Sequence, residues 1–197
     1  MHLTSFSLDN FVSQELSQLT ECQAREVADE FPDNQSWLST FVLSRIIWIP
    51  LPKDKAALAF ALIRRAEGAV TDYEEARKLL TNFISSDKNI SLYFRCFRRF
   101  EEAVAMVYQA LDFARNALNI KIFEQGDGST YERLNLIYNK SRHSNPERLP
   151  AGHLHAVWIK NEGLFADGTH LTFDELHDLV RDVGRIADKL SKGQTDT

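Results

Sequence analysis

The sequence predicts an all-α protein, an up-and-down helical bundle with long antiparallel helices and a small β-hairpin late in the chain. Apolar residues recur at spacings of three and four through two stretches of about thirty residues, 53–85 and 90–118. A short β-prone run bounded by turn residues occurs only late, within 155–173. With 197 residues, of which 44% are hydrophobic, the chain is long enough for one domain with a substantial core.

Residues 1–50 are predicted to form N-terminal helices that pack on the bundle. The first helix is expected over about residues 9–30, because its apolar residues keep a helical stripe, namely Val12, Leu16, Leu19, Val27 and Phe31. Pro32 ends it, and a second helix comes next that is apolar on nearly all sides. That pattern is typical of a buried helix. Its apolar residues are Trp37, Leu38, Phe41, Val42, Ile46 and Ile49.

Residues 51–191 are expected to form the bundle itself. In the stretch 90–118 the apolar side chains alternate three and four without a break, which predicts the seam of a left-handed bundle. Each of the two long helices would measure about 45 Å. A turn at 125–129 precedes a shorter amphipathic helix over 131–143, and Pro146 and Pro150 prevent it from continuing.

The end of the chain carries two further local signals. The run Val157–Ile159 lies beside the turn residues 161–163 and 167–168, which predicts a hairpin. Thr172 and Glu175 match a capping box at the start of a last helix, with Leu171 and Leu176 placed as a hydrophobic staple. Residues 192–197 are polar, and we expect a frayed tail.

Charge and cysteine content bound the class of protein. The net charge is −5, which argues against a dedicated binder of double-stranded nucleic acid. Cys22 and Cys96 lie far apart without CxxC spacing, so we expect a reducing compartment and no disulfide framework. No secretory signal is visible, and the most apolar run, 41–51, is too short to span a bilayer. These features predict a cytoplasmic protein without a membrane partner.

The most informative polar group stands at the end of the 131–143 helix. Asn139, Arg142 and His143 lie within about one turn of each other, with Asn139 and His143 at i, i+4. One interpretation is a polar helix C-terminus, where Arg and His cap carbonyls and complement the helix dipole. The other is a phosphate or RNA site. In that site His143 acts as general acid or base, Arg142 stabilises phosphoryl charge, and Asn139 orients one of them.

A helical bundle whose late helix ends in a polar-x3-His pattern resembles the HEPN superfamily. The trailing segments VWIKNEGL and LTFDELHDLV also resemble the region C-terminal to that motif in some bacterial HEPN-like proteins. The resemblance covers roughly residues 50–190. It implies an up-and-down bundle that dimerises, and a metal-independent ribonuclease site shared across the dimer. It also implies a role in a toxin–antitoxin or phage-defence module, with RNA and a cognate antitoxin or partner protein as partners.

The motif is degenerate in this chain. HEPN sites place an Arg four to six residues before the His, often with a polar residue directly after the Arg. Asn139 and His143 match the polar residue and the His, whereas Tyr138 occupies the Arg position. Arg142 would substitute only where the loop brings it to the same side as His143. The resemblance therefore implies either a ribonuclease or a degenerate relative.

Further basic residues are candidates for binding RNA phosphates. They are Arg95, Arg98 and Arg99, which would join Arg64 and Arg65 if the two long helices are neighbours, and Lys140. The alternative is that these charges occupy the solvated positions of amphipathic helices. Nearby glutamates, among them Glu101 and Glu102, would then neutralise them as part of the same solvated face.

Metal and cofactor motifs are weak or absent in the sequence. His153 and His155, with His170 or His177, lack a further ligand at tight spacing, so we predict no metal site. No nucleotide-binding glycine motif occurs, and we expect no cofactor. Two functions remain open: a HEPN-like, RNA-directed protein centred on His143, and a non-catalytic interaction protein that forms a homodimer or docks a partner.

Overall fold

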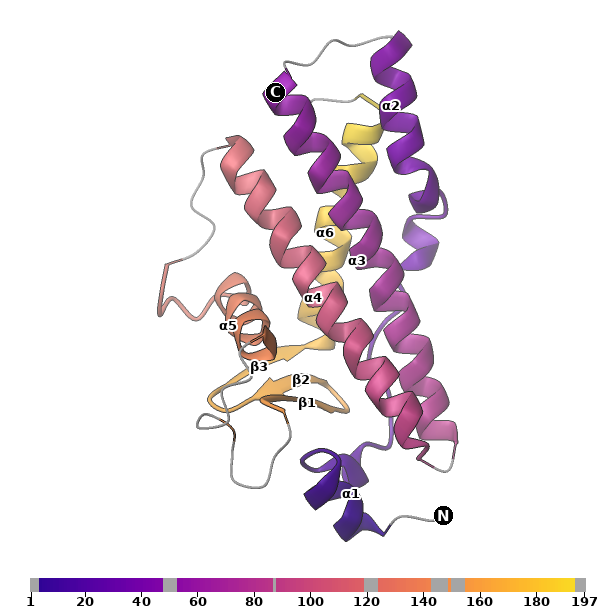
Figure 1. Cartoon of the computed structure of the whole chain (residues 1–197), viewed down its shortest axis with the longest axis vertical. Coiled ribbons are helices and arrows are strands. Elements are labelled where there is room, and N and C mark those ends of the chain that lie inside the picture. The colour runs from indigo at the N-terminus through magenta and orange to yellow at the C-terminus, as the bar shows by residue number, and fades with distance from the viewer. Residues whose placement is uncertain are drawn as a thin grey trace.

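The computed structural model describes residues 4–47, 53–86, 88–118, 124–142, 149 and 155–193. Over these ranges the chain forms six α-helices and one three-stranded antiparallel sheet, and helices dominate (Figure 1). The long helices lie side by side along the long axis of the molecule, and the sheet lies beside them with one short helix. The predicted all-helical character with a small late β element is therefore confirmed at this level.

The two longest helices form the centre of the fold. Helix α3 spans Lys53–Ser85 and helix α4 spans Ile90–Leu118, as their apolar spacing predicts. They run antiparallel: the Cys96 thiol donates to the Ala76 carbonyl, and Arg65 donates to Gln109. Helix α6, Phe173–Ser191, packs along both of them. Its capping box is confirmed, since Thr172 accepts from the Glu175 N–H at 3.2 Å and the Glu175 carboxylate accepts from the Thr172 N–H at 3.0 Å.

The late β element has three strands, so the predicted hairpin is too small. Strands β1 (Val157–Lys160), β2 (Gly163–Ala166) and β3 (Thr169–Thr172) pair in the order β1-β2-β3. The two turn signals in the sequence close two successive hairpins, one before Gly163 and one at Gly168, whose φ is +73°. A Cβ at position 163 would lie 2.3 Å from the Leu171 carbonyl oxygen, so only glycine fits there.

One face of this sheet belongs to the core. Five apolar side chains on that face are buried, namely Val157, Ile159, Leu164, Ala166 and Leu171. Helix α5, Thr130–Arg142, packs across all three strands and against α4. The Arg133 guanidinium also pairs with Glu175, which joins α5 to the start of α6. Burial alone would raise the pKa of Glu175, but the Thr172 N–H and Arg133 hold it below its usual value.

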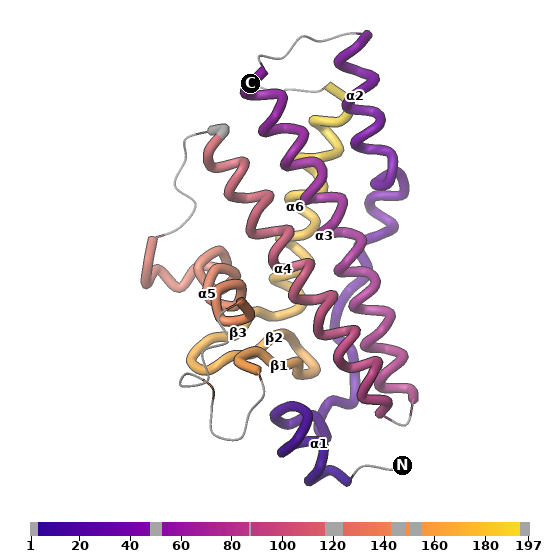
Figure 2. Tube along the Cα trace, in the orientation of Figure 1, coloured from indigo at the N-terminus to yellow at the C-terminus, as the bar shows by residue number. Residues whose placement is uncertain are grey.

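The prediction of one α-helix over residues 9–30 is wrong. Helix α1 spans only Ser5–Phe11, and Glu15 has a left-handed φ of 55°. Residues 12–31, which we call the N-terminal strap, contain two short 3₁₀ turns, and residues 19–27 have no regular structure. Figure 2 shows the strap running from α1 toward α2 along the helices. The apolar stripe is nevertheless real, since its five residues are all buried: Val12, Leu16, Leu19, Val27 and Phe31.

Side chains from other elements replace the hydrogen bonds that a helical strap would have made internally. The buried Glu74 carboxylate accepts from the backbone N–H groups of Val27 and Ala28, at 2.6 and 3.2 Å. The Lys88 ammonium donates to three strap carbonyls, at 2.7 to 3.2 Å. Asn161, after β1, accepts from two further strap N–H groups. The strap is thus irregular, but these backbone N–H and C=O groups have hydrogen-bond partners. Buried backbone polar groups require such partners.

Helix α2 corrects a second expectation. It spans Trp37–Ile47, and only its inner side is buried, through Trp37 and Phe41. The Trp37 indole also donates to Asp188 of α6. The outer side, which the sequence predicts to be buried, is exposed. Its apolar side chains are Val42, Leu43, Ile46 and Ile47.

Two further observations concern the helices and the cysteines of the described chain. None of the helices described is both long and apolar enough to cross a membrane. Cys22 and Cys96 are free thiols, and burial raises the pKa of both.

Substitution of Glu74 tests how the strap is held. Glu74→Leu strands two backbone N–H groups and leaves Arg77 without its i−3 carboxylate partner, so we expect it to lower the free energy of unfolding by about 3 kcal/mol. Glu74→Gln keeps an acceptor oxygen and should cost about 1 kcal/mol. Urea denaturation followed by circular dichroism measures both. Equal losses in the two variants would show that the carboxyl oxygen does not hold the strap.

Candidate functional site

The end of α5 carries three of the residues singled out from the sequence. Asn139 and Arg142 are exposed, and Lys140 is half-buried. The Asn139 amide donates to Asn135 at 3.0 Å, and Lys140 donates to the Asp167 carbonyl in the β2–β3 turn. His143 lies outside the described residues. The structure therefore places the amide and the guanidinium on the last turn of one helix and leaves the imidazole untested.

The Arg142 guanidinium contacts an aromatic side chain, Tyr138. The guanidinium donates to the Tyr138 hydroxyl at 2.5 Å, and its Cζ lies 5.3 Å from the centroid of the same ring. Tyr138 in turn stacks on Tyr108 of α4, with centroids 4.4 Å apart. The hydroxyl accepts only one of the five guanidinium N–H groups, and the described residues supply no other acceptor to Arg142 at this exposed position.

The basic residues of α4 do not gather with those of α3. The Arg99 guanidinium pairs with Asp72, Glu75 and Glu102, and Arg98 pairs with Glu102. Arg95 is exposed. Because Arg65 lies opposite Gln109, ten residues beyond Arg99, the two basic groups stand about 15 Å apart along the helices. The helices are neighbours, but their register separates the five arginines, and the carboxylates that pair with Arg99 include the buried Asp72.

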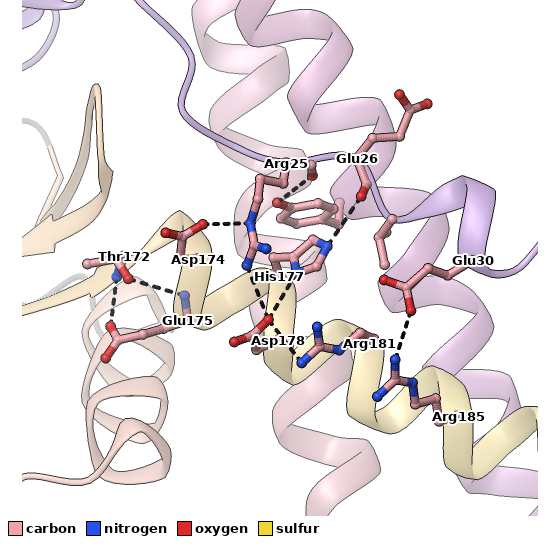
Figure 3. Close-up of polar contacts among 12 residues, drawn as sticks. Arg25, Glu26, Glu30, Thr172, Asp174, Glu175, His177, Asp178, Arg181 and Arg185 are labelled. Atoms are coloured by element: carbon pink, nitrogen blue, oxygen red, sulfur yellow. Dashed lines mark hydrogen bonds and ion pairs between the residues drawn. The ribbon is translucent and has the colours of Figure 1, made fainter.

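Two of the three histidines within the described ranges, His155 and His177, serve the fold, whereas His170 is exposed on β3. His155 places its ring nitrogens against the carbonyls of Val157 and Val12, and its ring packs on Phe97. His177 is buried between the Glu26 carbonyl and the Asp178 carboxylate (Figure 3). Among the described residues no group of three His, Cys, Asp or Glu side chains is arranged to hold a metal. His153 lies outside them.

The surroundings of His177 form a polar cluster that joins the strap to α6 (Figure 3). Arg25 reaches Asp174 at 2.7 Å and Asp178 at 3.2 Å, and Arg185 pairs with Glu30. Burial would raise the pKa of Asp178, but the His177 hydrogen bond and the neighbouring guanidinium groups hold it below its usual value. Each of these cations pairs with a carboxylate, so this cluster fastens the strap to α6.

Glu101 is a titratable group that sequence reasoning missed. The sequence interpretation assigns it to a solvated face with Glu102, whereas in the structure it is half-buried on α4. Burial, with a smaller contribution from the charge of Glu102, raises the pKa of Glu101 to about 7. The useful signal lies in the helical repeat, because Glu101 stands at i+4 from Phe97, whose side chain is buried.

A second candidate binding site is a groove between α2 and α3. It has a volume of about 580 Å³, within the range of ligand pockets. Phe41 and Phe60 face each other there, with ring centroids 6.4 Å apart. The groove is lined by Phe41, Val42, Arg45, Ile46, Lys53, Ala56, Ala57 and Phe60. Apolar side chains thus form most of the lining, and both of its charged residues are cations.

Outside the groove the apolar surface continues along α2. Leu43 is 56% exposed and Ile47 is 63% exposed, while Ile46 on the groove wall is 75% exposed. With Val42, four apolar residues therefore face solvent within two turns of one helix. A surface of this kind is typical of a binding site.

Glu101 generates a prediction about pH. Its folded-state pKa of about 7 lies above the unfolded value near 4.5, so the folded chain holds a proton that the unfolded chain loses in this window. Stability should therefore fall as pH rises from about 4.5 to 7. Glu101→Gln should remove this fall and stabilise the chain by about 2 kcal/mol at pH 8, with little change at pH 4.5. Urea denaturation across the pH range measures this difference, and a gain that is equal at both pH values would contradict the assignment.

Comparison with protein-family models, with curated proteins and with solved structures finds no match for this chain. Two surfaces of the molecule are therefore the candidates for function. One is the polar end of α5, and the other is the apolar groove between α2 and α3.

Proposed function

We propose that this chain is a helical interaction protein that binds a partner protein through the outer side of α2 and the adjoining groove on α3. The observation that carries the proposal is the exposure of Val42, Leu43, Ile46 and Ile47 beside Phe60, which is 40% exposed. A helix that is apolar on both sides buries both in a finished assembly. The chain's own core covers only one side of α2.

The fold does not require the outer side of α2. Trp37 and Phe41 on the inner side are each 2% exposed. Trp37 packs edge to face on Phe31 at 5.5 Å and donates to Asp188. These contacts fix the helix on α6 and the strap. The exposed residues add no comparable burial, so binding accounts for their apolar character better than folding does.

Paired substitutions on α2 separate folding from binding. Ile46→Gln replaces an exposed apolar side chain with a good helix former and should change the free energy of unfolding by no more than about 0.5 kcal/mol. Phe41→Ala on the inner side should cost about 3 to 5 kcal/mol. Thermal and urea denaturation measure both variants. A large loss for Ile46→Gln would mean that the outer side is part of the core.

Site-specific photocross-linking tests the proposed partner surface. A benzophenone side chain at Leu43 or Ile47 in the full chain, expressed in cells of its source, should give a discrete cross-linked product with another protein. The same probe at Thr71 or Lys78, which are exposed on α3 away from the groove, should not. Ile46→Gln should weaken the product. The same product at all positions, no product, or a product of two copies of this chain would each contradict the proposal.

The RNA-directed function is a second candidate, which the exposed position of Arg142 favours. Its guanidinium stands at the end of α5, one residue before His143, with N–H groups left for a phosphate. In this hypothesis His143 moves the proton during RNA cleavage.

Removal of the imidazole tests the RNA hypothesis. His143→Ala should lower cleavage of total RNA by at least about a hundredfold, whereas His170→Ala, at an exposed position on β3, should not. Cleavage is read on gels of purified RNA, with circular dichroism as the control for folding. Equal turnover by wild type and the His143 variant would exclude a catalytic role for His143.

A further inference from the structure

The charges of the α2–α3 groove are all of one sign. Among the described residues, Arg45 and Lys53 are the charged residues of the lining, and no acidic side chain lines it. No ion pair is formed by either residue within the described part of the chain, whereas Arg25 and Arg77 each pair with two carboxylates. The groove therefore keeps two cations beside an apolar surface.

Arg45 is the less well satisfied of the two cations. Its Nε is buried and has no hydrogen-bond partner among the described residues; the same holds for Arg99, Arg133 and Arg181, but each of those guanidinium groups pairs with a carboxylate through another nitrogen. Its guanidinium carbon lies 5.8 Å from the centroid of the Phe41 ring, so the planar group rests on the apolar floor. A buried N–H without an acceptor is unfavourable. A carboxylate placed over the groove would pair with the charge of the Arg45 guanidinium.

The shape of the surface fits a helix better than an enclosed small molecule. The wall residues Ile46 and Phe60 are themselves exposed, so the groove is open along its length. A small ligand is typically enclosed over most of its surface. An amphipathic helix instead inserts apolar residues spaced i, i+3, i+4 and i+7 into such a groove and leaves its polar side in solvent. The exposed Leu43 and Ile47 lengthen the apolar track beyond the groove itself.

A second copy of this chain is a poor occupant. Helix α2 has no acidic residue, so two α2 helices would bring Arg45 against Arg45. Helix α1 exposes Phe6 and Phe11, but its carboxylate, Asp9, already accepts from the Ser17 N–H and hydroxyl at 2.6 Å. The remaining large exposed apolar residues outside α2 and the groove are single side chains on separate helices, namely Phe94, Leu136 and Ile186.

We infer that the groove receives an amphipathic helix of another protein, with acidic side chains beside its apolar stripe placed to meet Arg45 and Lys53. This inference rests on the proposed interaction function and adds the chemistry of the partner. The acidic flank determines the orientation of the bound helix and the specificity for it, and the apolar stripe supplies most of the buried surface.

Two synthetic helical peptides test the inference directly. Both carry leucines at i, i+3, i+4 and i+7, and they differ only in having glutamates or lysines on the flanks. Fluorescence anisotropy should show that the full-length wild-type chain binds the glutamate peptide at least about tenfold more tightly at low salt. Added salt should narrow this ratio. Arg45→Glu with Lys53→Glu should reverse the preference, whereas the matched control Arg95→Glu with Lys78→Glu should keep it.

The outcomes separate this inference from the proposed function. Equal binding of the two peptides, lost in Ile46→Gln, would overturn the acidic partner and leave the apolar docking surface standing. Tight binding of the glutamate peptide that survives Ile46→Gln would place the contact elsewhere and overturn the groove assignment. Binding of neither peptide at millimolar concentration would overturn the inference that the partner is a helix. Photocross-linking at Leu43 tests the proposed interaction function independently of the peptides.

Discussion

The fold depends on one constraint: a buried segment without helical hydrogen bonds must find partners for its backbone elsewhere. The N-terminal strap crosses the face of α3 and α6 as irregular chain, and buried polar side chains supply the hydrogen bonds that its conformation lacks. Glu74 accepts from two strap N–H groups, the Tyr73 hydroxyl donates to the Arg25 carbonyl, and the Lys88 ammonium donates to three carbonyls. The same helix faces must therefore be apolar for packing and polar at a few positions. This explains why α3 buries Glu74 among its core residues.

The strap also shows where sequence reasoning succeeds and where it ends. Spacings of three and four correctly identify Leu16, Leu19 and Val27 as buried, but 3₁₀ turns and extended chain bury them as well as an α-helix would. The helices α3 and α4 are predictable because thirty residues of unbroken repeat leave one conformation that buries every apolar position. The capping box at Thr172 is predictable because both of its partners lie within four residues. The partners of the strap are distant in sequence, so no local pattern reveals them.

In the candidate sites, too, local features are predictable from the sequence, and contacts between distant residues are not. Sequence alone places Asn139 and Arg142 on one helix end, because that neighbourhood is local. It does not show that Tyr138 holds Arg142, or that the antiparallel register separates Arg65 from Arg99. Glu101 and Glu102 are adjacent in sequence yet differ in surroundings. Glu102 pairs with Arg98 and Arg99, while Glu101 turns into a half-buried position where its carboxylate is disfavoured. The perturbed group is thus fixed by helix packing, which the sequence encodes only indirectly.

Helix α2 gives the clearest connection between composition and function. An apolar residue contributes to stability only where folding removes it from water, and the outer side of α2 remains in water in the isolated chain. The inner side, through Trp37 and Phe41, already fixes the helix, so the outer side adds nothing that the fold needs. One side of the helix therefore carries apolar residues that the described part of the chain leaves exposed. Two cations stand at the edge of that side without a carboxylate from the described chain, although acidic residues outnumber basic ones overall. The exposed apolar side of α2 and the two cations of the groove are different chemical features, and the acidic, amphipathic partner that we propose would match both.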